Sequence, residues 1–186
     1  MLGMTAGFDE VGRGAWAGPL VVAGVALAGD TDTNFRDSKH YSKSAREAVL
    51  LEVYAVADQI SISVIQPQRI DEIGLGSALK LAFNQAASGL RRDVDEYIVD
   101  GAIDYLKLPN SRAEPKADDN YQSVAASSII AKVHRDWYMQ RLNSVGIDYG
   151  FDRHFGYGTK LHKQNLLEFG VGLHHRRSFK PIQKLL

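Results

Sequence analysis

Two adjacent carboxylates mark the stretch of this chain best suited to chemistry. Asp9 and Glu10 follow a short apolar run, and the sequence Gly12-Arg13-Gly14 comes directly after them. Gly18-Pro19 then precedes a second apolar run, so the order indicates a strand, a glycine-rich turn and another strand. Adjacent strand residues point to opposite faces, so both carboxylates can serve one site only where the strand ends. For this stretch alone, a solvated strand end is the simpler interpretation.

Two further carboxylates, Asp100 and Asp118, occupy similar positions. Asp100 ends the apolar run Tyr97–Val99 and precedes a glycine, and Asp118 follows a proline-containing stretch. Carboxylate oxygens suit hard divalent cations, and two metals about 3.5–4 Å apart are the usual arrangement for phosphodiester cleavage. Acids gathered at one end of a sheet repel one another unless cations or protons neutralise them. Four scattered surface acids are the alternative, because spacing cannot establish convergence.

Groups suited to a nucleic acid backbone accompany these acids. Arg13 stands between glycines whose amides could approach a sugar or phosphate closely. Lys39, Arg46 and Lys132 could contact phosphates, although solvated surface charges are the simpler interpretation for the first two. Lys132 differs because it lies among small and apolar residues. Tyr157, between two glycines, predicts either a core side chain or a stacking platform.

Composition narrows the class of protein. The chain has 186 residues, 45% of them hydrophobic and 24% charged, as expected of one globular domain. It has no cysteine, which excludes disulfides, a thiolate nucleophile and a zinc–thiolate site. With 22 basic and 22 acidic residues, it does not depend on bulk charge to bind a polyanion, although segregated charge stays possible.

Neither a signal peptide nor a membrane span is evident. The start lacks a basic and then apolar pattern, and Ala15–Gly29 is short and interrupted by Gly and Pro. We therefore expect a soluble cytoplasmic protein that does not enter a membrane. No free apolar helix or heptad pattern is visible, so a monomer is expected. The histidines His162, His174 and His175 lack partners at metal-ligand spacing, which favours structural or solvent-facing roles.

Apolar patterning predicts alternating strands and helices, and hence an α/β fold. Besides the first strand, we expect strands at Leu20–Leu27, Ile60–Ile65 and Tyr97–Val99, and a loop with at most one edge strand at Leu108–Lys116. Helices are expected at Ser44–Asp58, Ile70–Leu90, Tyr121–Leu142 and Thr159–Phe169. The first should begin with a Ser44/Glu47 capping box, and the second should be broken near Gly74. We also expect a loop at Gly146–Gly158 and a basic tail at His174–Pro181. The first two strands are joined too tightly for a parallel crossover, so the sheet is mixed.

These residues together resemble a known family, the type 2 ribonucleases H or ribonuclease HII. The opening Gly-Phe-Asp-Glu-Val-Gly-Arg-Gly at 7–14 matches, as do the later blocks in the family's order: Asp37-Ser38-Lys39, Val99-Asp100-Gly101, Lys116-Ala117-Asp118, the helix segment 125–136, Gly156-Tyr157-Gly158-Thr159 and the closing segment from His175. The match extends from about residue 6 to residue 182.

The resemblance implies both a fold and an activity. The fold is an α/β ribonuclease H-like mixed sheet flanked by helices, a single domain over 1–186 whose helical C-terminal extension covers about 153–186. The activity is endonucleolytic cleavage of RNA in RNA–DNA hybrids, and cleavage 5′ of single ribonucleotides embedded in duplex DNA. Two-metal-ion hydrolysis with Mg²⁺ or Mn²⁺ is implied, leaving 5′-phosphate and 3′-hydroxyl ends.

Carried over by motif position, the metal-binding catalytic acids are Asp9, Glu10, Asp100 and Asp118. The spacing from lysine through the later helix selects Asp118 rather than its neighbour Asp119. The loop of Gly12, Arg13 and Gly14 is implied to recognise the 2′-hydroxyl, and Tyr157 to pack against the sugar at the RNA–DNA junction.

Two departures from the family pattern are visible. Phe155 stands where a lysine usually precedes Gly-Tyr-Gly, and His40-Tyr41 replaces a more basic pair. Both changes predict slightly weaker backbone binding. The tail Gln183–Leu186 has no recognisable sliding-clamp peptide, so clamp binding is not expected.

Two other functions compete with the nuclease. A non-catalytic hybrid-binding module would not need the four acids, which are all present. A nucleotide-binding α/β protein would use Gly12–Gly18 as a phosphate loop, but that segment lacks the Gly-Lys-Ser/Thr ending and the Gly-x-Gly-x-x-Gly pattern.

Overall fold

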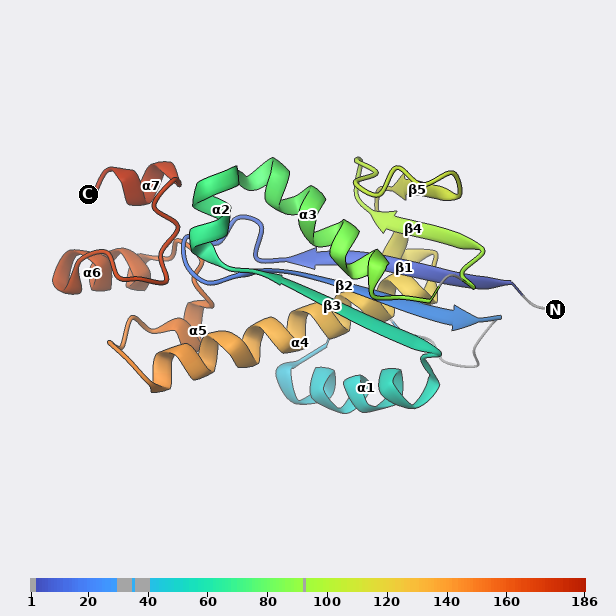
Figure 1. Cartoon of the computed structure of the whole chain (residues 1–186). Helices are drawn as coiled ribbons and strands as arrows, with labels where there is room; N and C mark the ends of the chain where they lie inside the picture. The colour runs from blue at the N-terminus through green and yellow to red at the C-terminus, as the bar shows by residue number, and fades with distance from the viewer. Residues whose placement is uncertain (1–2, 30–34, 36–40, 92) are drawn as a thin grey trace.

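A five-stranded mixed sheet forms the centre of the computed structural model, which describes residues 3–29, 35, 41–91 and 93–186 (Figure 1). The strand order is β3-β2-β1-β4-β5. The strands are β1 Met4–Val11, β2 Leu20–Ala28, β3 Gln59–Ile65, β4 Glu96–Asp100 and β5 Ser111–Glu114. β2 is antiparallel to both β1 and β3, whereas β4 is parallel to β1 and β5. The predicted mixed sheet with an antiparallel first pair is therefore confirmed.

The alternating side chains of β2 separate two apolar cores. Leu20 and Val22 pack on the face covered by α2 Pro67–Ile73 and α3 Leu75–Ser88. Val21 and Ala23 point to the opposite face, which α4 covers. α1 packs beside α4 and adds apolar side chains to this second core (Figure 1). α1 is Lys43–Val56 and α4 is Gln122–Ser144. The small residues early in α4 allow it to lie directly against β1 and β2.

The C-terminal part is helical, as predicted. It contains α5 Phe151–His154, α6 Lys160–Phe169 and α7 Lys180–Gln183, which lie beyond one end of the sheet (Figure 1). Backbone hydrogen bonds join this part to the β1–β2 loop: Trp16 N donates to Gly156 O at 2.8 Å, and Arg176 N donates to Trp16 O at 2.7 Å. A short 3₁₀ helix, η2 Ala117–Asp119, precedes α4.

Several expected boundaries were wrong. The cap of α1 is Ser42, whose hydroxyl accepts from Ala45 N at 3.2 Å, so the Ser44/Glu47 capping box was misplaced. The helical segment expected at 70–90 begins earlier, at Pro67, whereas the break expected near Gly74 is confirmed, because Gly74 has φ of +78° and separates α2 from α3. The loop expected at 146–158 contains the single turn α5.

The expected basic tail is instead a packed segment. His175 forms a β-bridge with Ala17, and both His175 and Arg176 are buried. The run of basic residues suggested solvent exposure, but the side chains of His175 and Arg176 form hydrogen bonds inside the protein. The expected edge strand within 108–116 is present as β5. The segment Asp37-Ser38-Lys39 and His40 lie outside the described residues.

Among the described helices, each is too short or too polar to cross a lipid bilayer.

Candidate active site

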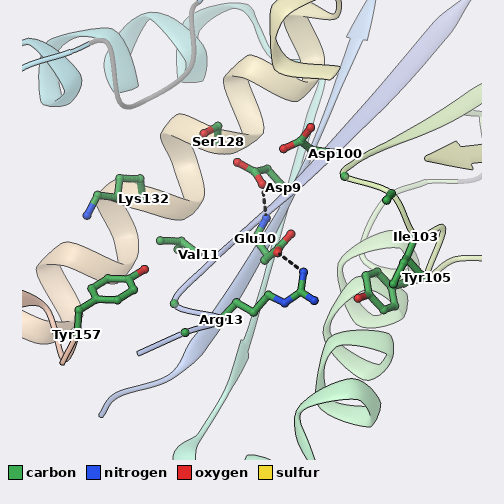
Figure 2. A pocket seen from close by; sticks show the side chains of 14 residues that line it. Asp9, Glu10, Val11, Arg13, Asp100, Ile103, Tyr105, Ser128, Lys132 and Tyr157 are labelled. Carbon is green, nitrogen blue, oxygen red and sulfur yellow. Dashed lines mark hydrogen bonds and ion pairs between the residues drawn. The ribbon is translucent and has the colours of Figure 1, made fainter. Parts of the chain in front are cut away.

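A pocket of about 460 Å³ opens at the end of the sheet where β1 and β4 finish. Its walls come from β1 and the loop after it, the loop after β4, α4 and the loop before α6 (Figure 2). The predicted site residues that line it are Asp9, Glu10, Gly12, Arg13, Gly14, Asp100, Lys132 and Tyr157. Segments far apart in the sequence therefore meet at one place.

The parallel pairing of β1 with β4 explains why two of the acids converge. Phe8 is registered with Val99, so the next residues along the two strands are Asp9 and Asp100. Each strand has its carboxyl end at this edge of the sheet, and each places its carboxylate in the pocket. Asp100 lies close enough to raise the pKa of Asp9 electrostatically.

Asp9 is the most strongly perturbed of these acids. The pKa of Asp9 is raised to about 7, mainly by burial and also by the nearby carboxylates of Glu10 and Asp100. Two hydrogen bonds act in the opposite direction: the Ser128 hydroxyl donates to the carboxylate, and Glu10 N donates to Asp9 Oδ1 at 2.7 Å. A carboxylate near its titration point is one that a cation would strongly stabilise in the ionised form.

Glu10 turns toward the glycine-rich loop. Arg13 Nη1 lies 3.7 Å from Glu10 Oε1, and Figure 2 shows this ion pair beside the Asp9 carboxylate. Burial raises the pKa of Glu10, the Arg13 cation lowers it, and Asp100 raises it. The Arg13 side chain is 56% exposed, so it is accessible from the pocket. Neighbouring strand residues thus reach one pocket from different sides, as a strand end permits.

The donor set suits a hard divalent cation. Asp9, Glu10 and Asp100 offer only carboxylate oxygens, and their mutual repulsion raises the Asp9 pKa. Across the described part of the chain, no three acidic or histidine side chains are already gathered tightly enough to enclose an ion. Magnesium usually keeps several waters and takes few protein ligands, so such an open arrangement fits it.

Asp118 lies beside this pocket without lining it. It is the middle residue of η2, whose first residue, Ala117, donates its N–H to Asp100 Oδ1 at 3.0 Å. Asp118 is half-buried, while the adjacent Asp119 is exposed. The hydrogen bond from Ala117 therefore ties the turn carrying Asp118 to Asp100.

The two outer glycines of the Gly12-Arg13-Gly14 loop differ in what surrounds them. Gly12 is buried with φ of +88°, and a Cβ there would come within 2.2 Å of Arg135 Nε and 2.8 Å of Pro19 O. Gly14 is exposed, and a Cβ there would meet nothing within 4 Å. The fold itself requires glycine at position 12, but none of the described residues occupies the space at Gly14.

Two of the cations predicted to contact phosphates, Lys132 and Arg46, already contact a carboxylate of this chain. Lys132 Nζ contacts Asp136 Oδ1 at 2.6 Å and lies 4.6 Å from the Phe155 ring centre. Arg46 Nη1 lies 3.7 Å from Asp136 Oδ2 and does not line the pocket. Asp136 therefore holds both cations, and only Lys132 faces the pocket. Lys39 lies outside the described residues.

Tyr157 stands at the pocket rim rather than in the core. Its side chain is 37% exposed, and the Arg135 guanidinium carbon lies 5.5 Å from its ring centre. His162 Nδ1 donates to Tyr157 O at 3.0 Å, which fixes the backbone at this point. Of the two interpretations from the sequence, the exposed position favours a stacking surface.

Sequence reasoning missed some of the pocket's lining. Ser128 precedes Lys132 by four residues on α4 and so shares its helix face, a signal that was present in the sequence. Ile103 and Tyr105, in the loop after β4, carried no comparable signal. The histidines His162 and His175 are buried and bonded to each other at 3.1 Å, which confirms a structural setting for both.

The mixed sheet, its flanking helices and the carboxylate-lined pocket together define a protein of the ribonuclease H-like class. The fold is similar to the crystal structure of the ribonuclease H2 from Pyrococcus horikoshii, with a TM-score of 0.81 and 26% identity over 98% of this chain and 96% of that one. A PCNA:RNase HII complex from Archaeoglobus fulgidus gives a TM-score of 0.75 and 28% identity, covering 95% of each chain. Bst-RNase HIII in complex with Mn²⁺ shares the fold alone, with a TM-score of 0.74 and 18% identity over 100% of this chain and 70% of that one.

Sequence comparison identifies the family. The model of the family described as Ribonuclease HII matches residues 6–182. Ribonuclease HII of Thermus thermophilus is 41% identical over 182 residues, covering 96% of this chain and 87% of that protein. Ribonuclease HII of Francisella philomiragia is 40% identical over 185 residues, covering 97% and 98%. The chain belongs to the ribonuclease HII family of metal-dependent endoribonucleases, which cleave RNA in RNA–DNA hybrids.

Proposed function

We propose that this chain cleaves the RNA strand of RNA–DNA hybrids and also cuts 5′ of single ribonucleotides embedded in duplex DNA. The observation that carries the proposal is that Asp9, Glu10 and Asp100 share one pocket with the loop Gly12–Gly14. A cluster of carboxylates that can bind cations thus lies beside a loop that can recognise a sugar. Family membership supports the same activity.

In this proposal, Asp9, Glu10, Asp100 and Asp118 hold divalent cations, two by the family resemblance, with Mg²⁺ or Mn²⁺ as candidates. Divalent cations held by these carboxylates would supply activation of a water and stabilisation of the departing 3′-oxygen of the phosphodiester. The chain's own part is to hold Asp9, Glu10 and Asp100 together, where a bound cation would relieve the repulsion between their carboxylates, and to keep the turn that carries Asp118 tied to Asp100. Ser128 and Glu10 N fix the Asp9 carboxylate, and Ala117 N fixes Asp100.

Recognition of RNA is assigned to the glycine-rich loop. The 2′-hydroxyl distinguishes a ribonucleotide from a deoxyribonucleotide at a given site. Gly14 is exposed and has open space where a side chain would stand, so backbone groups there can approach a sugar closely. A site built to hydrogen-bond a hydroxyl rejects an analogue that lacks it by about 10⁴–10⁵. We propose that this loop supplies that discrimination.

The remaining contacts are assigned to the rim of the pocket. Tyr157 packs against the sugar at the RNA–DNA junction, and Lys132 contacts a backbone phosphate while Asp136 orients it. Arg46 and Lys39 are proposed as outer phosphate contacts. Phe155 supplies a ring against Lys132 where the family usually has a lysine, so one backbone contact is absent at that position.

We further propose that the chain acts as a monomer and that the segment Gln183–Leu186 is not a sliding-clamp peptide. The Archaeoglobus protein was solved as a complex with PCNA. Here, Gln183–Leu186 has no aromatic pair of the kind a clamp peptide would supply.

The test is cleavage of three labelled duplexes with Mg²⁺ or Mn²⁺: an RNA–DNA hybrid, a DNA duplex with one ribonucleotide, and an all-DNA duplex. We expect cuts in the hybrid, a single cut 5′ of the ribonucleotide with 3′-hydroxyl and 5′-phosphate ends, and an intact all-DNA duplex. Tight hybrid binding without cleavage would instead indicate a binding module. Equal cutting of the all-DNA duplex would refute the role given to the glycine-rich loop.

A further inference from the structure

Two arginines are completely buried next to the proposed recognition loop. Arg135, on α4, and Arg176, in the segment before α7, are each 0% exposed. Within the described residues, neither guanidinium forms a salt bridge with a carboxylate at 4.0 Å or less. Burial lowers the pKa of Arg135, and burial together with the Arg135 cation lowers the pKa of Arg176 to about 9. Asp136 and Asp71 act on these cations only from a longer distance, so burying two like charges without a directly paired carboxylate is costly and needs an explanation.

Arg135 joins the two loops that carry the proposed substrate contacts. Its Nε donates to Pro19 O at 2.9 Å and its Nη2 donates to Ala17 O at 3.1 Å, both in the β1–β2 loop. Its Nη1 donates to Phe155 O at 2.9 Å, two residues before Tyr157. One side chain therefore sets the distance between the glycine-rich loop and the loop that bears Tyr157.

Arg176 holds the same β1–β2 loop from its other side. Its Nη1 donates to Arg13 O at 3.0 Å, and its Nε donates to Gly18 O at 3.0 Å. Arg13 is the central residue of the Gly-Arg-Gly motif, so this hydrogen bond acts on the motif itself. The remaining terminal nitrogen, Nη2, is buried without a hydrogen-bond partner among the described residues. The Phe179 ring lies 5.1 Å from the guanidinium carbon and supports its plane.

Every side-chain hydrogen bond of these two arginines ends on a carbonyl of the two loops. The planar guanidinium offers five donors in a fixed fork, which a lysine cannot reproduce. The fit is close, since a single added carbon on Gly12 would collide with Arg135 Nε. One of the acceptors, Arg13 O, belongs to the Gly12–Gly14 motif, and the others lie in the same loop or two residues before Tyr157.

We propose that Arg135 and Arg176 are positioning residues for ribonucleotide recognition, which fix the Gly12–Gly14 loop and the Tyr157 loop relative to each other without contacting substrate. This inference rests on the proposed function of those loops. It predicts that the geometry of the guanidinium forks, and not only their charge, determines how well the protein distinguishes a ribonucleotide from a deoxyribonucleotide.

The test compares Arg135→Lys and Arg176→Lys, which keep the charge and lose the fork. Arg177→Lys and Arg141→Lys are matched controls, since Arg177 is an exposed neighbour in the same segment and Arg141 is exposed on α4. For each protein, kcat and KM are measured on the duplex with one ribonucleotide. Dissociation constants are measured without divalent metal for that duplex and for its all-DNA equivalent, well below the unfolding temperature.

We expect kcat/KM on the ribonucleotide duplex to fall by about 100-fold in both buried-site variants, as a displacement near 1 Å can cause. The ratio of the dissociation constants for the all-DNA duplex and the ribonucleotide duplex should fall as well. The dissociation constant for the all-DNA duplex, and every constant of the two control variants, should stay within about threefold of wild type. A purely structural role would lower the unfolding temperature and leave that preference unchanged, which would overturn the proposal.

If the lysine variants do not fold, Phe179→Leu provides the second test, because it loosens the support of Arg176 without touching either loop. A loss of preference of about threefold or more supports the proposal, and an unchanged preference refutes it. Wild-type protein that cuts the all-DNA duplex as fast as the ribonucleotide duplex would instead refute the role proposed for the glycine-rich loop, and this inference with it.

Discussion

Gly12 and Gly14 stand two residues apart in one motif, yet their replacement by alanine should have opposite consequences. Gly12→Ala should destabilise the fold, and Gly14→Ala should leave the fold intact and impair ribonucleotide cleavage. The difference follows from the space around each Cα. A Cβ on Gly12 would lie 2.2 Å from Arg135 Nε, whereas a Cβ on Gly14 would meet nothing within 4 Å.

The magnitude for Gly12→Ala combines two costs. A non-glycine residue in the left-handed region, where Gly12 has φ of +88°, costs about 1–2 kcal/mol. Inserting a carbon into a packed site costs about 1–3 kcal/mol more. The sum is roughly 2–5 kcal/mol, which at about 2–4 °C per kcal/mol lowers the unfolding temperature by on the order of 10 °C.

Gly14→Ala should change stability by no more than about 0.5 kcal/mol, because the position is exposed and unobstructed. If a substrate sugar approaches this backbone closely, the added methyl group displaces it, and kcat/KM should fall by about 100-fold. Thermal unfolding followed by circular dichroism gives the first quantity. Cleavage of a duplex with one ribonucleotide, below both unfolding temperatures, gives the second.

Two results would refute this reasoning. A Gly12→Ala protein as stable as wild type would mean that Arg135 does not pack against Gly12 as described. A Gly14→Ala protein with full activity would mean that the substrate does not approach the loop at that residue. Loss of stability in both variants would remove the distinction between them.

Two further predictions concern the neighbouring acids and the buried histidines. Asp118→Asn should reduce cleavage by more than about 100-fold while the exposed Asp119→Asn stays near wild type, and equal activities of the two would contradict the choice of Asp118. Burial lowers the pKa of both His162 and His175 to about 4, from an ordinary value of 6.5. Since the unfolded chain takes up these protons first, stability should be complete above pH 6.5 and decline as the pH falls toward 4. His162→Asn should show a smaller decline in unfolding temperature between pH 7 and pH 5 than wild type, and an equal decline would contradict this account.

The sequence predicted the elements that patterning and chemistry both specify. A short, continuous run of apolar and β-branched residues identified β2, and the tight connection before it required an antiparallel pair. The acids at the ends of β1 and β4 were recognisable because a carboxylate followed an apolar run. Their convergence was not derivable from spacing, because it depends on the parallel register that aligns Phe8 with Val99.

Other features depend on tertiary contacts that local sequence does not encode. Arg176 belongs to a run of basic residues that suggested a solvated tail, yet it is buried because loop carbonyls accept from it. Lys132 and Arg46 read as independent phosphate contacts, but both reach Asp136. The difference between Gly12 and Gly14 is invisible in a motif, because only the packing of Arg135 creates it.

The central claim is that the carboxylate pocket is the active site of a ribonuclease, and Asp100→Asn tests it most directly. An asparagine oxygen can still accept the Ala117 N–H, so the turn stays in place while the charge is lost. Asp152→Asn, an exposed acid on α5, is the control. On a duplex with one ribonucleotide and Mg²⁺, we predict a fall in cleavage rate of more than about 100-fold for Asp100→Asn and none for the control. A folded Asp100→Asn protein that cuts 5′ of the ribonucleotide at the wild-type rate would contradict the account.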